Sequence, residues 1–345
     1  MTCRARECRS QKLFACLSGL LGLVLIGGCG ISSPTSSSLP GASNSSAASN
    51  AVTDGAQLGL AWSAADATLR PVMGVPGSAQ FGASLVSAGS FSNAAFSAQS
   101  QLALLVDSKH NLYLLALPAS QPTLVTQGMP ANAAIVFSPL GGSAAIYAPG
   151  ASAATVIGGL PLKPVISQVQ TGTAIQAASI SDAGTLALAA GTSSSGVTIT
   201  TITAAGTKGT IAALTGFGGM TFLPASEDIL LADSGANTLT RLHNGAVQTL
   251  ATAKDGLNQP LAVAASLDSH WAVTANHANG TLVRIDLTAA TPTVRSTCTC
   301  SPSTLAPLNG NAVFELTAPG TAATWMIEAD DQVPRVLFIP PARHG

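Results

Sequence analysis

The apolar positions of this chain recur at a nearly constant interval. Seven short windows rich in apolar residues begin at positions that differ by 42, 42, 42, 43, 42 and 41 residues. A period of about 40 to 45 residues with several short strands per unit is typical of β-propellers, whereas helical solenoids of similar period contain longer amphipathic stretches. The sequence has no such stretches. The windows are GLAWSAA from Gly59, QLALLVD from Gln101, SAAIYAP from Ser143, TLALAAG from Thr185, DILLADS from Asp228, HWAVTAN from His270 and NAVFELT from Asn311.

Further strands are expected around each window. An inner strand precedes it, as in MTFLP from Met220, and two alternating strands follow, as in LYLLAL from Leu112 and VQTLAT from Val247. Four strands per unit predict an all-β fold, a seven-bladed β-propeller. The first unit is less regular, because its inner strand would have to come from around residues 51–56. Six full blades plus a partial one is therefore the alternative.

The first residues have the order of an export signal. Four basic residues precede an apolar run of 14 residues at positions 13–26, which is too short to cross a bilayer comfortably. The run ends in Ile26-Gly27-Gly28-Cys29, which resembles the lipobox of bacterial lipoprotein signal peptides. In that motif the cysteine is lipidated and becomes the new N-terminus. A signal peptide with a chance cysteine, or an uncleaved short anchor, is the alternative.

These features predict three segments. Residues 1–28 form a lipoprotein signal peptide, residues 29–50 a disordered, flexible Ser-rich tether, and residues 51–345 the propeller. Lipid on Cys29 would anchor the exported protein to a membrane of the cell envelope. Gly30, rather than Asp, follows the cysteine, which resembles the sorting pattern for the outer membrane if the cell has one.

The charge balance excludes one class of partner. Only 8% of the residues are charged, and without residues 1–28 the chain carries 10 basic and 14 acidic residues. Nucleic-acid binding depends on Lys and Arg side chains that neutralise phosphates. A weakly acidic chain without a basic stripe is therefore not expected to bind nucleic acid.

One segment carries a family resemblance. FLPASEDILLADSGANTLTRLHNG, residues 222–245, resembles an NHL or YVTN-type β-propeller repeat, in which an apolar strand leads through Asp-Ser-Gly-x-Asn to a second strand. Proteins of these families include recognition modules, scaffolds and a few enzymes such as lactonases and lyases. The resemblance thus implies the fold and leaves the activity open.

Polar residues gather in the loops that join the second and third strands of the units and in the connections between units. In a propeller these segments lie on one axial face, which is where a ligand or partner docks in many binding folds. We therefore predict an axial-face binding site. The alternative is that these loops are polar only because they are in contact with water. Its residues are Asp107, His110, Asn111, Asp233, Asn237, Asp255, Asn258, Asn276 and His277.

No catalytic or metal-binding motif stands out. Asp268-Ser269-His270 has the residue types of a triad, but neighbours in a strand point to opposite faces. The five histidines are scattered without ligand spacing. We expect no cofactor and no metal site. Calcium is the alternative, since the lactonase-type propellers that the fold resembles hold it through carboxylates and amides.

Two cysteines of the predicted domain are close in sequence. Cys298 and Cys300 form a C-x-C pair between two units, in a chain that we expect to be exported to an oxidising compartment. The pair could form a short disulfide, remain as two buried thiols, or bind a soft metal. The sequence leaves these three readings open.

Two functions fit these observations. The first is a membrane-tethered, non-catalytic binding or scaffolding module of the cell envelope that recognises a protein, peptide or glycan. The second is an exported propeller enzyme, a calcium-assisted hydrolase or lyase with an axial site. Three or more carboxylate or amide side chains converging on the channel mouth would favour the enzyme.

Overall fold

The computed structural model describes residues 56–341, except 88, 100, 120, 193–195, 290–292, 299, 321 and 331–332. The predicted signal peptide, the lipidation site Cys29 and the tether lie outside the described residues. Within the described part, no helix is long and apolar enough to span a bilayer.

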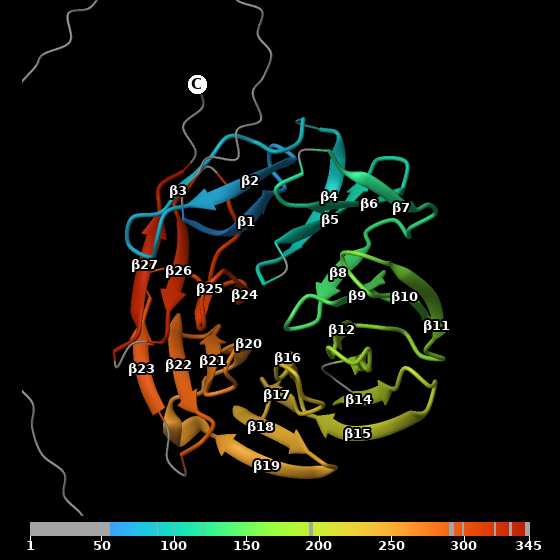
Figure 1. The fold of residues 1–345 in the computed structure, drawn as a ribbon. Helices are drawn as coiled ribbons and strands as arrows, with labels where there is room; N and C mark the ends of the chain where they lie inside the picture. The colour runs from blue at the N-terminus through green and yellow to red at the C-terminus, as the bar shows by residue number, and fades with distance from the viewer. Residues whose placement is uncertain are drawn as a thin grey trace, which may run out of the picture. The chain divides into compact units, whose positions relative to one another are not determined.

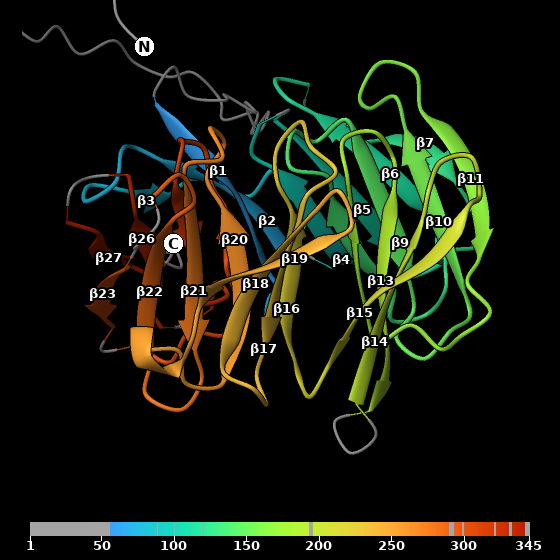
Figure 2. The same cartoon turned by 90° about the horizontal axis from the view of Figure 1, so that it is seen from below.

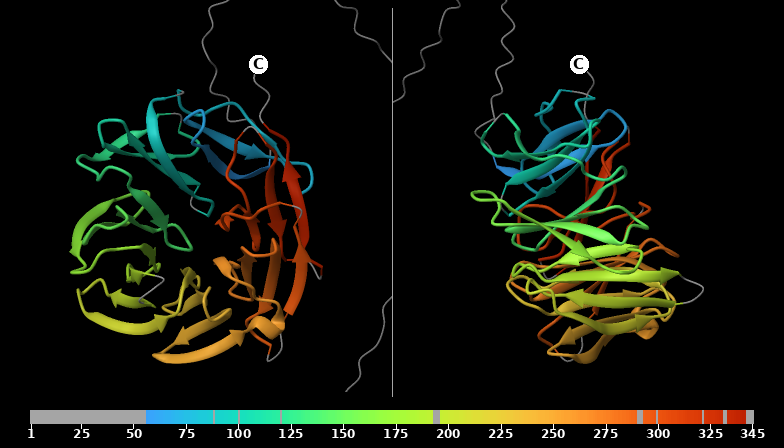
Figure 3. Two further views of the ribbon diagram at one scale, coloured as in Figure 1. Left: turned by 180° about the vertical axis from the view of Figure 1, so that it is seen from behind. Right: turned by 90° about the vertical axis from the view of Figure 1, so that its right-hand side faces the viewer.

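Seven antiparallel sheets are arranged around a central axis and form a seven-bladed β-propeller (Figure 1). Two further views show the same ring from behind and from the side (Figure 3). The blades contain, in order, β1 (Gln57–Ser63), β2 (Thr68–Met73) and β3 (Gln80–Phe81); β4 (Phe91–Ser97), β5 (Leu102–Asp107), β6 (Leu112–Ala116) and β7 (Thr123–Thr126); β8 (Ala134–Phe137), β9 (Ser143–Tyr147), β10 (Ala153–Gly158) and β11 (Val165–Gln170); β12 (Ala177–Ile180), β13 (Leu186–Thr192), β14 (Gly196–Ile202) and β15 (Lys208–Leu214); β16 (Phe217–Phe222), β17 (Ile229–Asp233), β18 (Thr238–His243) and β19 (Ala246–Ala251); β20 (Pro260–Ala265), β21 (Trp271–Asn276), β22 (Thr281–Asp286) and β23 (Thr293–Thr297); and β24 (Ala306–Pro307), β25 (Val313–Glu315), β26 (Thr324–Glu328) and β27 (Arg335–Ile339).

The second strand of each blade explains the repeating apolar windows. On β5, Leu104 packs toward the third blade in a cluster with Ile146, whereas the next residue, Leu105, packs toward the first blade in a cluster with Leu69. Because successive side chains of a strand point to opposite faces, a strand between two blades needs apolar residues at every position. This requirement turns the expected alternation into a continuous apolar run.

The first blade differs from the other six. It contains three strands in the described part, and Ala61 and Trp62 of β1 line the same cavity as the inner strands of the other blades. β1 begins at the end of the ring that carries the loops between first and second strands, beside Asn309 of the β24–β25 loop and Ser97 of the second blade. It therefore runs in the direction of the second strands, as its window predicted. The inner strand expected around residues 51–56 falls almost entirely outside the described residues.

The ring closes by packing between the first and last blades. Val72 of β2 and Met326 of β26 belong to one buried cluster, although they lie at opposite ends of the domain in sequence. The amide of Asn309, in the loop between β24 and β25, donates a hydrogen bond to the backbone carbonyl of Gln57 at 3.0 Å. Every sheet in the described part is built from strands that are consecutive in sequence, so the two termini share no blade.

Consecutive antiparallel strands place their connections alternately at the two ends of the ring. Figure 2 views the domain edge-on, with the strands running from one face to the other. We call the face that carries the loops between second and third strands the 2–3 face, and the opposite one the 1–2 face. The 2–3 face includes residues 108–111, 234–237 and 277–280, and the 1–2 face includes residues 138–142, 223–228 and 266–270.

Candidate functional site

All nine residues predicted for the axial site lie on the 2–3 face. They occupy the ends of β5, β17 and β21, the loops that follow these strands, and the connection from β19 to β20, which contains the short 3₁₀ helix η1 (Ala253–Asp255). The strand order therefore brings them to one face, as the sequence predicted. Their hydrogen bonds determine which of them are available to a ligand.

Asp107 is engaged in its own turn. Its carboxylate accepts hydrogen bonds from the backbone N–H of Lys109 at 2.8 Å and of Asn111 at 2.8 Å, and from the side chains of Asn111 and Tyr113. Desolvation acts to raise the pKa of Asp107, but these hydrogen bonds outweigh it and hold the pKa below its ordinary value. The carboxylate and Asn111 thus stabilise the β5–β6 loop.

Asp233 has the same role in the fifth blade, with more partners. Its carboxylate accepts from the backbone N–H and hydroxyl of Thr215 and from the N–H groups of Gly216, Gly235 and Ala236, at 2.8 to 3.0 Å. Desolvation again acts to raise its pKa, and the hydrogen bonds outweigh it, so the pKa lies below the ordinary value. The residue ties the β17–β18 turn to the connection before β16.

The amides also serve the backbone. The side chain of Asn276 accepts from the N–H of Asn258 and donates to the carbonyl of Gly256, and Asn237 accepts from the N–H of Gln259 at 2.6 Å. Asp255 accepts from the N–H of Thr252 in a capping box at η1. Most of the predicted site therefore holds loops in place, and the exposed imidazoles of His110 and His277 have no hydrogen bond among the described residues.

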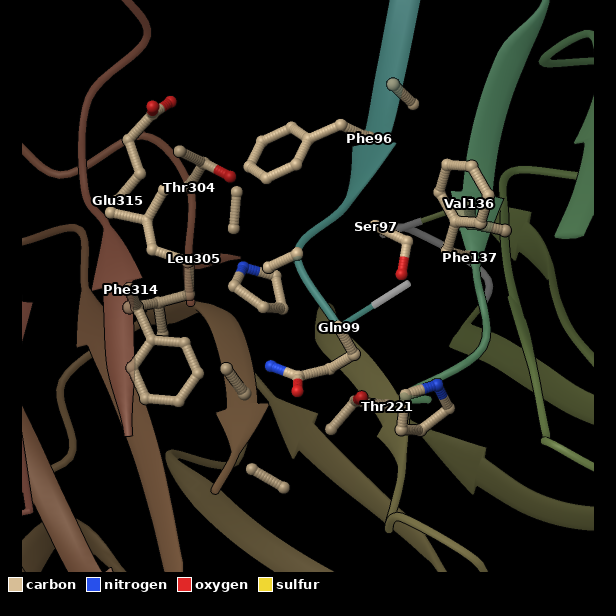
Figure 4. Close-up of a pocket in the computed structure, with 18 of the residues that line it drawn as sticks. Phe96, Ser97, Gln99, Val136, Phe137, Thr221, Thr304, Leu305, Phe314 and Glu315 are labelled. Carbon is tan, nitrogen blue, oxygen red and sulfur yellow. The ribbon is translucent and has the colours of Figure 1, made fainter. Parts of the chain in front are cut away.

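A second site, which the sequence did not predict, lies on the axis of the ring. A cavity of about 630 Å³ is bounded by the inner strands of the blades. This volume is in the range of small-molecule sites in proteins. Its walls are mainly apolar, and Trp62 is among the residues that line it. Figure 4 shows three further aromatic side chains of the wall, Phe96, Phe137 and Phe314.

The polar side chains of this cavity are mainly hydroxyls and amides, together with one carboxyl group. In Figure 4 the amide of Gln99 extends toward the centre, and its Nε2 is buried without a hydrogen-bond partner among the described residues. Thr221 and Thr304 supply hydroxyls on opposite walls, and Glu315 is 7% exposed. Burial raises the pKa of Glu315 to about 8, so its carboxyl is largely protonated at neutral pH. A perturbed acid in a concave site is a frequent mark of function.

A signal for Glu315 was present in the sequence. It lies inside the apolar window NAVFELT between Phe314 and Leu316, where every neighbouring strand position is buried. An ionisable residue within an apolar run is costly to bury, so its position is informative. Gln99 follows the inner strand in a loop of polar and small residues, and nothing in that context distinguishes it.

The structure also shows the chemical state of the C-x-C pair. Cys298 and Cys300 are joined by a disulfide directly after β23, and Cys298 packs with Leu282 and Leu305 in the core between the last two blades. Of the three readings left open by the sequence, the structure therefore contains the disulfide. Among the described residues, no three His, Cys, Asp or Glu side chains are grouped as a metal site requires.

Comparisons with known proteins give the fold alone. No protein-family model matches the chain, and no curated protein matches it in sequence. A protein of unknown function from Desulfotomaculum acetoxidans has a similar structure, with 12% identity, a TM-score of 0.56, and coverage of 83% of this chain and 100% of the other. Virginiamycin B lyase from Staphylococcus aureus aligns with 11% identity, a TM-score of 0.51, and coverage of 73% and 84%.

A third similar structure is a β-propeller domain from another protein. The β-propeller domain of Cps50 (Swd1) from Myceliophteria thermophila aligns with 10% identity, a TM-score of 0.52, and coverage of 73% of this chain and 88% of the other. Structures as different as a lyase and this domain share the architecture. The comparisons therefore establish a β-propeller and do not select among its functions.

Proposed function

We propose that the protein is a lipid-anchored, non-catalytic binding module of the cell envelope that receives its ligand in the axial cavity. The observation that carries this proposal is the contrast between the two candidate sites. The carboxylates of Asp107 and Asp233 are saturated by hydrogen bonds within the fold. The axial cavity, in contrast, has mainly apolar walls, and Gln99 on its wall has a buried Nε2 without a hydrogen-bond partner among the described residues. Apolar walls with a few placed polar groups are typical of binding sites.

The chemistry of the cavity narrows the partners that the sequence left open. A glycan requires many hydrogen bonds to replace those that its hydroxyls make with water, whereas the walls of the cavity are more apolar than polar. An apolar group of a peptide, protein or small molecule fits these walls better. We therefore propose that the partner inserts an apolar group along the axis.

The anchoring part of the proposal rests on Cys29. Replacement Cys29→Ser removes the thiol that would carry lipid, and it leaves the propeller untouched. We expect the variant to leave the membrane fraction of cells that express it, whereas a Cys300→Ser variant remains there. An unchanged distribution of Cys29→Ser would contradict lipid anchoring.

The binding part of the proposal is tested by filling the cavity. Thr221 lies on the cavity wall, and Thr210 lies exposed on outer strand β15. A set of small apolar compounds and short peptides is screened for an increase in the thermal unfolding midpoint of the full Cys29→Ser chain. We expect the effect of binders to be lost in Thr221→Trp and kept in Thr210→Trp. Binders that are unaffected by Thr221→Trp, or that are converted to product, would refute the proposal.

A further inference from the structure

Glu315 is the last residue of β25 and faces the junction between the last and first blades. Phe314 packs toward the sixth blade, whereas Val313 packs with Val72 of the first blade. Because side chains alternate along a strand, Glu315 shares the side of Val313, where the cavity opens. The carboxyl group lies on the cavity wall and has no hydrogen-bond partner among the described residues.

No positive charge among the described residues compensates this carboxyl group, whose pKa is set by burial alone. In the described part no Lys, Arg or His lines the cavity, and β1, β4, β20, β21 and β24 carry no ionisable side chain. β2 carries Arg70 on the face that it shares with Val72. This guanidinium donates to the carbonyl of Gly82 and lies 3.8 Å from the carboxylate of Asp66. Glu328 on β26 bonds to Arg335 outside the cavity. Arg284 on β22 donates to the carbonyl of Ala329 and covers the ring of Trp271 at 3.9 Å. The nearest charges are thus engaged elsewhere, which leaves an isolated buried acid.

The walls next to Glu315 are aromatic. Phe96 packs in the cluster that contains Val313, and Trp62 lies on the same wall of the ring. Figure 4 shows Phe96 opposite the last blade, on which Glu315 and Thr304 lie. Aromatic faces attract organic cations, and a carboxylate in an apolar site is stabilised strongly by an opposite charge. These two features select the same kind of ligand.

We propose that the axial cavity binds an apolar organic ammonium ion, with Glu315 as its counter-ion and Phe96 and Trp62 against its cationic end. The ligand supplies the positive charge that the cavity lacks, and its hydrocarbon part lies along the apolar walls. This inference rests on the proposed binding function and specifies its ligand. The ammonium group comes either from a free amine or from the N-terminus of an apolar peptide.

Calorimetric titration tests the counter-ion. The full Cys29→Ser chain is titrated with 4-phenylbutylamine and with the uncharged 4-phenylbutan-1-ol at pH 6, 7 and 8. Because Glu315 must ionise to bind the amine, its affinity is expected to rise on the order of fifty-fold from pH 6 to pH 8, with release of about one proton per amine at pH 7. The affinity of the alcohol is expected to be independent of pH.

Matched variants assign the effect to one carboxyl group. Glu315→Gln is expected to weaken amine binding at pH 8 by at least about tenfold and to remove its pH dependence. Glu328→Gln makes the same chemical change on the neighbouring strand, outside the cavity, and is expected to bind the amine like the parent chain. Equal binding of amine and alcohol at every pH would overturn the ammonium inference and leave the cavity as a binding site.

The remaining outcomes separate the two proposals and the two ligand sources. One outcome is that neither compound binds, while other compounds of the screen bind the parent chain and not Thr221→Trp. The ammonium inference is then wrong, and the binding function stands. If no compound binds at all, both fail. Phenylalanyl-leucinamide and its N-acetylated form distinguish the two sources of the ammonium group. If the partner is a peptide, only the form with the free N-terminus binds, and its affinity depends on pH. If the ligand is a free amine, 4-phenylbutylamine binds more tightly than either peptide.

Discussion

The side-chain amide of Asn309 donates a hydrogen bond to the backbone carbonyl of Gln57, a residue 252 positions earlier in the chain. The backbone N–H of Asn309 bonds to the neighbouring carbonyl of Leu58. One residue of the last blade therefore holds the start of β1 in the first blade. No shared strand closes the ring in the described part, so these bonds and the buried cluster around Val72 and Met326 perform this role.

Asn309→Ala is expected to destabilise the domain by about 1 to 2 kcal/mol, because it removes one side-chain hydrogen bond and leaves the Gln57 carbonyl without that donor. Urea denaturation followed by tryptophan fluorescence measures the change. Asn258→Ala, at an exposed position of the 2–3 face, is the matched control and is expected to stay within about 0.5 kcal/mol of the parent. Equal effects of the two substitutions would show that Asn309 has no special part in closure.

Gly218→Ala is expected to destabilise the domain much more than Gly142→Ala. A Cβ atom at Gly218 would lie 2.2 Å from the carbonyl oxygen of Pro260 in the next blade and 3.1 Å from that of Ala232. Backbone atoms cannot move aside cheaply, so we expect a loss of about 2 to 4 kcal/mol from overpacking. At Gly142 a Cβ meets nothing within 4 Å. A thermal midpoint for Gly218→Ala close to that of Gly142→Ala would mean that the fifth and sixth blades are less tightly apposed than the structure has them.

The repeat could be predicted from the sequence because burial on both faces makes six of the second strands continuous apolar runs, and their spacing is constant. The first unit shows the limit of this signal. GLAWSAA falls at the same interval and forms β1, which runs in the direction of the second strands. No comparably apolar window directly precedes it, and the inner strand expected around residues 51–56 falls almost entirely outside the described residues.

The candidate sites were predictable to different degrees. Strand topology placed Asp107 and Asp233 on one face, as expected, but it does not say whether a carboxylate turns outward or back to its own loop. That choice depends on the φ, ψ angles of the turn, which the residue types suggest only weakly. The axial cavity was missed because its walls come from seven units, and the isolation of Glu315 is evident only when the neighbouring blades are in place.

Asp233→Ala is expected to lower stability at neutral pH by about 2 to 4 kcal/mol, since five donors lose their acceptor. The pKa of Asp233 lies below its ordinary value in the folded protein, so its contribution is present above pH ~4 and is lost as the pH falls through the folded pKa. The difference between parent and variant should therefore shrink in acid. Denaturant midpoints at pH 7, 4 and 2.5 measure it, and a difference that stayed constant over this range would argue against an ionised acceptor.

Glu315→Gln is expected to stabilise the domain at alkaline pH and to change it little in acid. In the folded protein burial raises the pKa of Glu315 from 4.5 to about 8, so between these values the folded state holds a proton that the unfolded chain has released. Stability must then fall as the pH rises through this window, by at most about 1.4 kcal/mol per pH unit for this group. The parent should lose on the order of 3 kcal/mol of unfolding free energy between pH 5 and pH 8 relative to Glu315→Gln.

The control is Glu328→Gln, which removes an outer ion pair. This variant is expected to show the same dependence of unfolding free energy on pH as the parent. Free energies of unfolding in urea at pH 5, 6.5, 8 and 9 provide the comparison, and parallel curves for the parent and Glu315→Gln would place the carboxyl group in contact with solvent instead of in the apolar cavity.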